Sequence, residues 1–262
     1  MNHATIWITG ASSGIGEAFA REAEAAGATR LILSARREDA LEQVRAGMQR
    51  PDDHRVVQLD LADTDALGPL AEQVWHEHGP IDIIVHSGGI TQRSLAKDTT
   101  FDVYRRIIDV DFLGTVALTQ ALLPHMLERD HGHIVMISSL VGKFGTPLRS
   151  AYAAAKHALH GYADAVRAEL ADTGVHVTVF CPGFIRTNIS VNALLEDGTP
   201  QGRDDPAIIN GKDPADCARA IRKAIEKNRG EAYFAGKEML GVYLKRFTPR
   251  LFEKIIPRLP VR

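Results

Sequence analysis

The chain lacks several features that mark specialised classes of protein. It has only two cysteines in 262 residues, too few for a disulfide framework. Its 31 basic and 33 acidic residues nearly cancel, so no overall charge attracts it to nucleic acid or to a membrane. We expect no signal peptide, because no basic N-terminal region precedes an apolar stretch, and no run long enough to span a membrane. These absences favour a reducing, cytoplasmic setting, disfavour nucleic acid as a partner and make any anion-binding site local.

Hydrophobic residues form 45% of the chain, enough for one large core. Short β-rich runs alternate with longer segments of helical period, which predicts a single α/β domain with a doubly wound parallel sheet and helices on both faces. The expected strands are Thr5–Thr9, Arg30–Ser34, Val56–Leu59, Ile81–Ser87, His133–Ile137, His176–Cys181 and Ala232–Phe234. The expected helices are Ile15–Ala26, Asp39–Met48, Thr64–His78, Phe101–Arg129 with room for a break, Ala151–Ala171 and Pro214–Asn228.

A glycine-rich turn, Thr9-Gly-Ala-Ser-Ser-Gly-Ile-Gly16, follows the first expected strand, and a helical pattern begins at once. Glycines here let the backbone approach a pyrophosphate, while the helix N-terminus offers free N–H groups and a favourable dipole. An ordinary tight turn is the alternative, but the place and spacing of the three glycines disfavour it. The candidate cofactor-binding residues of this turn are Gly10, Ser12, Ser13, Gly14, Ile15 and Gly16.

The sequence after the second expected strand, Ser34-Ala-Arg-Arg37, bears on which dinucleotide is bound. An NAD site places a carboxylate here for the ribose 2′-hydroxyl, whereas a 2′-phosphate needs cations. The acidic position is empty, and Arg36 and Arg37 can bind a phosphate, so NADP is favoured over NAD. Solvated loop arginines are the alternative. Asp60, followed by Leu61, ends the third strand and can accept a hydrogen bond from an adenine amino group or cap the next turn.

Tyr152 and Lys156 lie four residues apart in the alanine-rich stretch Ser150-Ala-Tyr-Ala-Ala-Ala-Lys156 and therefore share one helix face. A nearby ammonium stabilises a phenolate, so this pair can act as a general acid or base. An unrelated surface Tyr and Lys is the alternative. Ser139 follows the fifth strand, at the carboxyl edge where open α/β sheets bind ligands, and its hydroxyl can hydrogen-bond a substrate oxygen.

These motifs, together with Pro182-Gly183, resemble the single-domain short-chain dehydrogenase/reductase family over approximately residues 4–235. The resemblance implies a Rossmann-type sheet and hydride transfer between a nicotinamide and a carbonyl or alcohol. It implies that Tyr152 donates the proton, that Ser139 orients the carbonyl, and that Lys156 assists Tyr152 and holds the nicotinamide ribose. It adds these candidate cofactor-binding residues: Ser87, Gly88, Gly89, Tyr152, Lys156, Pro182, Gly183 and Thr187.

The chain departs from the family pattern at two places. The family's Asn-Asn-Ala-Gly reads His86-Ser-Gly-Gly89 here, and we expect His86 to be a hydrogen-bonded structural residue because no partner ligands for a metal accompany it. The family's Asn three residues before Gly114 is Asp111 here, a fourth candidate catalytic residue. Its charge is expected to raise the pKa of Lys156.

Two segments lie outside the regular pattern. Residues 188–213 form a long loop without periodicity, in the place where relatives have a flexible substrate lid. Residues 236–262 form a basic amphipathic extension. It can contact an anionic membrane, or its apolar residues can pack on the domain, cover the substrate site or face another subunit. The apolar residues to which these three alternatives apply are Leu244, Phe247, Leu251, Phe252 and Ile255.

The leading interpretation is an NADP(H)-dependent reductase of a ketone or aldehyde, with an apolar or moderately bulky substrate. A nucleotide-sugar epimerase also uses a Tyr–Lys pair, but such proteins usually have a larger substrate domain. An NADP(H)-binding redox sensor without turnover is the alternative from another class, motivated by His86 and Asp111. By the resemblance, a homo-oligomer is expected through the helices at 101–129 and 151–171.

Overall fold

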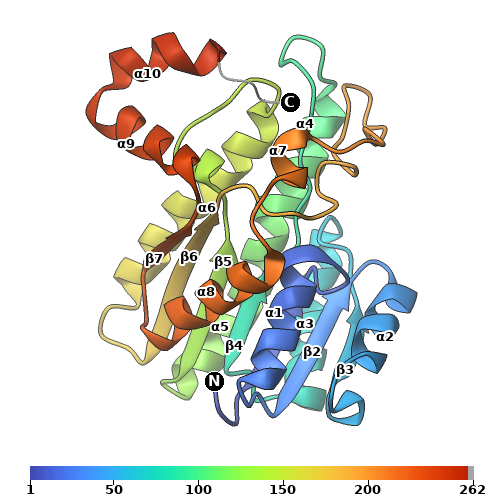
Figure 1. Cartoon of the computed structure of the whole chain (residues 1–262). Helices are drawn as coiled ribbons and strands as arrows, with labels where there is room; N and C mark the ends of the chain where they lie inside the picture. Colours follow the sequence, from blue (N-terminus) through green and yellow to red (C-terminus); the bar gives the residue numbers. More distant parts are fainter. Residues whose placement is uncertain (259–262) are drawn as a thin grey trace.

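Seven parallel strands form one twisted sheet in the computed structural model, which describes residues 1–258. The order across the sheet is β3-β2-β1-β4-β5-β6-β7, so the chain starts near the middle and winds outward in both directions (Figure 1). The strands are β1 (Thr5–Thr9), β2 (Arg30–Ala35), β3 (Arg55–Gln58), β4 (Ile83–His86), β5 (Gly132–Ile137), β6 (Val175–Pro182) and β7 (Glu231–Phe234). This is the expected doubly wound, Rossmann-type α/β fold in a single domain.

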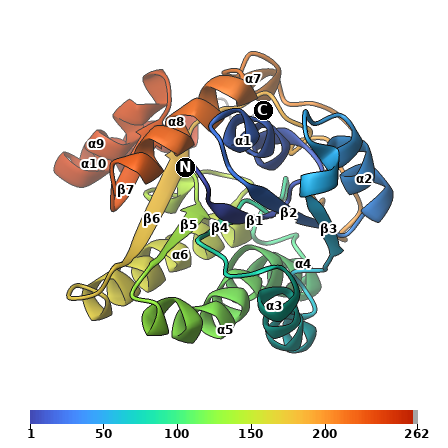
Figure 2. The same ribbon diagram turned by 90° about the horizontal axis from the view of Figure 1, so that it is seen from below.

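Helices cover both faces of the sheet (Figure 2). On one face lie α1 (Gly14–Ala25), α2 (Glu38–Ala46) and α8 (Pro214–Glu226); on the other lie α3 (Thr64–His78), α4 (Phe101–Ile108), α5 (Gly114–Glu128) and α6 (Ser150–Glu169). The remaining helices are α7 (Pro206–Ile209), α9 (Leu240–Phe247) and α10 (Pro249–Ile255), with short 3₁₀ turns at Pro51–Asp53, Leu140–Gly142, Lys237–Met239 and Ile256–Arg258.

The apolar strands explain why both faces must be covered. In β1, Ile6, Trp7 and Ile8 are all fully buried, although successive side chains point to opposite faces. Trp7 belongs to the core under α3, α5 and α6, whereas Ile6 and Ile8 belong to the core under α1 and α8. A strand buried on both faces reads as a continuous apolar run, the pattern from which the parallel sheet was predicted.

The expected helix at Phe101–Arg129 is interrupted by one π-helical turn at Asp109–Leu113, between α4 and α5. Such turns insert extra backbone into an α-helix and often occur at functional sites. The turn contains Asp111, whose side chain is fully buried. The sequence left room for a break, but it did not give the type or position of the turn.

The same stretch, residues 101–128, is long and apolar enough to span a membrane by length and composition alone. The expectation that no run reaches this length is therefore wrong. In the structure the stretch covers the sheet beside α3 and α6, and its Asp111 forms an ion pair with Lys156 of α6. These contacts are those of a core helix of the domain.

The loop at residues 188–213 contains regular structure that its weak periodicity did not predict. It contains α7, and Leu194 pairs with the segment after β4 through an isolated parallel bridge to Gln92. The extension after β7 folds into α9 and α10, which lie beside the carboxyl end of the sheet (Figure 1). Residues 259–262, including the basic Arg262, lie outside the described part of the chain.

Candidate functional site

The strand order reverses between β1 and β4, which opens a crevice at the carboxyl ends of these strands. The glycine turn lies there, between β1 and α1. Gly10 has a φ of +67°, and a Cβ at this position would lie 2.6 Å from the backbone nitrogen of Gly88. A Cβ on Gly16 would collide with the carbonyl oxygen of Gly10. Only glycine therefore allows this approach of β1, α1 and the segment after β4.

Ser12, Ser13 and Ile15 complete the turn. Ser13 is the N-cap of α1 in an extended conformation, and its side chain makes no capping hydrogen bond. Because the first N–H groups of a helix have no acceptor within the helix, this end of α1 presents donors and a positive dipole to the crevice. The sequence prediction of an anion cradle at this turn agrees with this geometry.

A cavity of about 630 Å³ lies beside the edge strand β3 and the start of α3, and its lining includes Arg36, Gln58 and Asp60. The side chain of Arg36 is exposed, as is that of Arg37. No carboxylate follows β2 in the position expected for an NAD ribose, and the Ser34 hydroxyl there is buried and accepts a hydrogen bond from the Trp7 indole at 2.8 Å. The cavity thus combines an exposed guanidinium with a carboxylate in its lining.

Asp60 and Leu61 have more specific surroundings than the sequence indicated. One carboxylate oxygen of Asp60 accepts a hydrogen bond from the Ala62 N–H at 3.0 Å, so it caps the turn, and the exposed residue still lines the cavity. The Leu61 side chain is buried against Gly88 and Gly114. A ligand would therefore meet the backbone of Leu61.

The segments that follow β4 and β6 converge beside the glycine turn. A Cβ on Gly14 would lie 3.0 Å from Cγ2 of Thr187, so Thr187 lies over the glycine turn. A Cβ on Gly89 would lie 3.1 Å from Asp111 Oδ2 and 3.4 Å from Lys156 Nζ. The turn at Ser87–Gly89 is thus packed between the glycine turn and the face of α6.

The Pro182-Gly183 segment is tied to the C-terminal extension, which the sequence did not indicate. Pro182 ends β6, and the Gly183 N–H donates to the Phe234 carbonyl at 3.0 Å. The Glu238 carboxylate accepts hydrogen bonds from the Phe184 N–H at 3.3 Å and the Gly236 N–H at 2.9 Å. Residues after β7 therefore help to fix this segment.

Tyr152 and Lys156 are buried on one face of α6, as their spacing predicted. Lys156 Nζ lies 5.6 Å from the centroid of the Tyr152 ring and donates to the Ile137 carbonyl at 3.2 Å. Ser139 begins the 3₁₀ turn after β5, and its Oγ accepts a weak hydrogen bond from the Val141 N–H at 3.3 Å. The carboxyl end of β5 thus brings Ser139 to the face that carries Tyr152 and Lys156.

Asp111 is the closest charged neighbour of Lys156 in the described structure. Its Oδ2 lies 3.2 Å from Lys156 Nζ, and its Oδ1 accepts a hydrogen bond from the Ile90 N–H at 2.7 Å. Burial raises the pKa of the Asp111 carboxyl despite the opposing effects of Lys156 and Ile90. Burial alone would lower the pKa of Lys156, but the charges of Asp111 and Tyr152 raise it overall, as predicted for Asp111 from the sequence.

His86 has the structural role that the sequence predicted. It is buried at the end of β4, and its Nε2 lies 3.0 Å from the Thr119 hydroxyl of α5. Burial lowers its pKa to about 3, so the imidazole is neutral at pH 7. No cluster of metal ligands is found among the described residues.

A partly buried network around Ser138 was missed from the sequence. His160 Nε2 lies 3.1 Å from Ser138 Oγ, and its Nδ1 lies 3.5 Å from the Glu231 carboxylate of β7. Burial alone would raise the pKa of Glu231, but hydrogen bonds from His160, Lys143 and Tyr233 lower it to about 2. These residues are far apart in sequence, and only the strand order places β7 beside α6 and β6.

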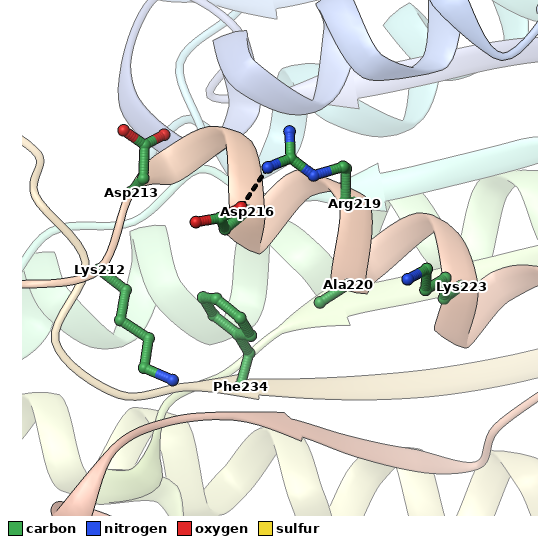
Figure 3. A pocket seen from close by; sticks show the side chains of 7 residues that line it. All are labelled: Lys212, Asp213, Asp216, Arg219, Ala220, Lys223 and Phe234. Atoms are coloured by element: carbon green, nitrogen blue, oxygen red, sulfur yellow. Dashed lines mark hydrogen bonds and ion pairs between the residues drawn. The ribbon is translucent and has the colours of Figure 1, made fainter.

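A second cavity, of about 490 Å³, lies between α8 and the end of β7 (Figure 3). Its lining consists of Lys212, Asp213, Asp216, Arg219, Ala220, Lys223 and Phe234. Lys212 lies over the Phe234 ring at 4.6 Å, and Arg219 pairs with Asp216. None of the candidate catalytic residues lines this cavity, so it is distinct from the site described above.

The crevice fits a dinucleotide. The glycine turn would hold the pyrophosphate, Arg36 and Asp60 would meet the adenosine end, and Thr187 and Lys156 would meet the nicotinamide end. Such a crevice, beside a buried Tyr–Lys pair, defines the class of dinucleotide-dependent oxidoreductases. Comparison with known proteins identifies the family.

The family model described as short chain dehydrogenase matches residues 4–197. The chain is 39% identical over 264 residues to dehydrogenase/reductase SDR family member 7B of Rattus norvegicus, covering 98% of this chain and 81% of the relative. It is 41% identical over 259 residues to dehydrogenase/reductase SDR family protein 7-like of Anopheles gambiae, covering 96% and 81%. The chain therefore belongs to the short-chain dehydrogenase/reductase family and is a hydride-transfer oxidoreductase that binds a nicotinamide dinucleotide.

Solved structures agree with this assignment. A short-chain dehydrogenase from Streptomyces avermitilis is 31% identical with a TM-score of 0.81, covering 97% of this chain and 96% of that one. A Burkholderia phymatum short-chain dehydrogenase/reductase in complex with NAD shares the fold, with a TM-score of 0.83, 23% identity and coverage of 100% and 98%. A serine dehydrogenase complexed with NADP+ has a TM-score of 0.77 at 25% identity, covering 88% and 94%.

The Asp111–Lys156 pair predicts a distinctive pH dependence for an Asp111→Asn variant. Asn can still accept from Ile90, so we expect turnover at neutral pH within about tenfold of wild type. Because the Asp111 charge raises the pKa of Lys156, its removal lets the ammonium deprotonate at lower pH. The alkaline limb of the kcat/KM profile should shift to lower pH. Complete loss of turnover, or an unmoved alkaline limb, would contradict this account.

Proposed function

We propose that the protein is an NADP(H)-dependent reductase of a ketone or aldehyde, with Ser139, Tyr152, Lys156 and Asp111 as its catalytic residues. The observation that carries this proposal is the buried Lys156 ammonium, which lies 3.2 Å from Asp111 Oδ2 and 5.6 Å from the Tyr152 ring centroid. A charge held in an apolar core needs a fixed partner, and here its other neighbour is a phenol suited to proton transfer.

Each residue has one task in this proposal. Ser139 Oγ hydrogen-bonds the substrate oxygen, and the Tyr152 hydroxyl donates a proton to that oxygen. Lys156 stabilises the phenolate that remains, and Asp111 keeps Lys156 charged and in place. The bound nicotinamide supplies the hydride. An apolar carbonyl compound fits the neighbouring side chains, since Leu140 is buried and Phe184 half-buried.

The competing proposal is an NADP(H)-binding sensor without turnover. It rested on the departures at His86 and Asp111, and both now have structural explanations. His86 is neutral and bonded to Thr119, and Asp111 is the counter-ion of Lys156. Neither arrangement interferes with proton transfer, so the departures no longer favour the sensor.

Replacing Tyr152 tests the reductase proposal directly. Mixed with NADPH and a panel of aldehydes and ketones, the wild-type protein should oxidise NADPH. Tyr152→Phe should be slower by about 10²-fold or more, because it lacks the general acid. Cofactor fluorescence should show nearly unchanged NADPH binding by the variant. Binding without oxidation of NADPH across a broad panel would support the sensor instead.

The preference for NADP rests on Arg36 and Arg37, both exposed after β2, and on the lack of a carboxylate in the ribose position. The guanidinium groups are free to form charge-assisted hydrogen bonds to a 2′-phosphate. A related structure holds NAD and another holds NADP+, so the family alone does not decide the preference. An NADPH-rich cytosol is the setting that we propose.

Charge removal at the adenosine end should therefore discriminate between the two cofactors. For Arg36→Ala, we expect KM for NADPH to rise about tenfold, while KM for NADH stays within about twofold. Lys227→Ala removes an exposed cation at the far end of α8 and serves as the matched control. Equal losses with both cofactors, or a wild-type preference for NADH, would overturn the assignment.

We also propose that the C-terminal extension makes a peripheral contact with a membrane. Phe252 is buried and packs edge-on against Phe144 at 5.4 Å, and Leu244 and Ile255 are half-buried, as expected for a packed helix face. Phe247 and Leu251 do not pack on the domain, since they are 75% and 47% exposed, and they remain available to another subunit or to a membrane. The outer face thus combines exposed apolar residues with basic side chains, a composition suited to an anionic bilayer.

Flotation with anionic vesicles tests this contact on the full chain. The wild-type protein should float with phosphatidylserine-containing vesicles and less with neutral ones, since basic residues contribute to binding. Phe247→Ser with Leu251→Ser should lose most of the floating fraction, while the control Leu127→Ser, exposed on α5, should not. Equal flotation of the double variant and wild type would end the membrane proposal.

We also propose a homo-oligomer through the α4–α5 and α6 surfaces.

A further inference from the structure

The substrate loop, residues 188–213, is attached to the protein through a buried ion pair. The Asp205 carboxylate accepts from Arg93 Nε at 2.7 Å and lies 2.6 Å from Arg93 Nη2. Both side chains are less than 5% exposed. The Gln201 amide donates to the other carboxylate oxygen at 3.2 Å, and Arg149 Nη2 lies 3.6 Å from Oδ2. Asp205 is therefore the anchor by which the loop meets two buried guanidinium groups.

Backbone hydrogen bonds fix the loop at a second place beside Arg93. The Leu194 N–H donates to the Thr91 carbonyl, and the Arg93 N–H donates to the Leu194 carbonyl, both at 2.8 Å. The side chain of Leu194 then packs in a small hydrophobic cluster that includes Ala151 and Tyr152. The loop thus shares a hydrophobic cluster with Tyr152.

Gln92, next to Arg93, holds the start of the catalytic helix. Its Oε1 accepts hydrogen bonds from the N–H of Ala151 at 2.7 Å and of Tyr152 at 3.3 Å. Both N–H groups lie in the first turn of α6, where the helix itself provides no acceptor. Gln92 is fully buried, so no solvent replaces this acceptor in the folded protein.

Arg149, the residue before α6, interacts electrostatically with Asp205 of the loop and with Tyr152 of α6. Burial and the charge of Arg93 lower its pKa to about 10, against the opposing effects of Asp205 and Tyr152. The guanidinium is still charged at neutral pH. The Asp205 carboxylate therefore stabilises the buried Arg93 and Arg149 cations while the loop is closed. Opening the loop would remove this stabilisation.

We propose that Gln92 and Arg93 are positioning residues. Arg93 holds the substrate loop closed through Asp205, and Gln92 holds the first turn of α6 and thereby places Tyr152. This inference rests on the role of Tyr152 in the proposed function. Two adjacent residues in the segment after β4 thus serve both substrate enclosure and proton transfer. Substrate affinity should depend mainly on the Arg93–Asp205 pair, and turnover mainly on Gln92.

Limited proteolysis of Asp205→Asn tests the first part without needing a substrate. The variant keeps the shape of the side chain and loses its charge, so trypsin should cleave at the exposed Arg203 about tenfold faster as the loop opens. Asp213→Asn is the matched control, since Asp213 forms an exposed ion pair with Arg186 at 2.8 Å, 58% and 47% exposed, and Asn still caps α8. Equal cleavage rates for both variants and wild type would overturn the proposal.

Kinetics separate positioning from general stability. With a carbonyl substrate found in the panel, Asp205→Asn should raise KM about tenfold and leave NADPH binding within about twofold. Gln92→Met, which has a similar shape but no acceptor, should instead lower kcat about tenfold with little change in KM. Parallel changes of kcat and KM in both variants would contradict separate roles.

A double variant keeps the test possible if a single variant fails to fold. Arg93→Met with Asp205→Leu removes both charges and should fold better than either single replacement, because no partner in the pair is left alone. Its loop should still be cleaved faster than that of wild type. Loop cleavage at the wild-type rate in this double variant would overturn the proposal that the Arg93–Asp205 pair holds the loop closed. If no substrate is reduced at all, the proposed function fails, while proteolysis still decides whether this ion pair holds the loop.

Discussion

The rest of the site depends on one buried ion pair, between Lys156 on α6 and Asp111 in the π turn, 3.2 Å apart. Burial alone lowers the pKa of Lys156, and the Asp111 carboxylate raises it again, so the ammonium persists to a higher pH than it would without this partner. The carbonyl of Ile137, at the end of β5, gives the ammonium a second contact at 3.2 Å. Helix, π turn and strand therefore meet at Lys156, and Tyr152 is placed one turn before it.

The sheet topology brings the other components to this pair. Reversal of strand order between β1 and β4 opens the crevice beside the glycine turn, and Gly89 lies over Asp111 and Lys156. The segments after β6 and β7 are joined to each other, because the Glu238 carboxylate accepts a hydrogen bond from the Phe184 N–H. The proposed chemistry thus needs contributions from both halves of the sheet, and no single motif provides the site.

Much of the fold could be predicted because periodicity is local: the continuous apolar strands and the helix at Ser150–Glu169 were visible in the sequence. The glycine turn and the Tyr152–Lys156 spacing are also local patterns. The contacts of Arg93 with Asp205 and of His160 with Glu231 were not predictable, because they join residues far apart in the chain. The exposure of Phe247 likewise depends on which face α9 turns toward the domain, which its composition alone did not show.

In the proposed mechanism, the Lys156 ammonium is the group that makes Tyr152 an effective proton donor. Single-turnover reduction of a carbonyl substrate at saturating NADPH, compared between wild type and Lys156→Met, tests it most directly. Methionine matches the length of the lysine stem but carries no charge. We predict that the rate of the chemical step falls by about 10²-fold or more in the variant, even with cofactor fully bound. An unchanged single-turnover rate at full NADPH occupancy would show that the Lys156 ammonium does not assist proton transfer from Tyr152.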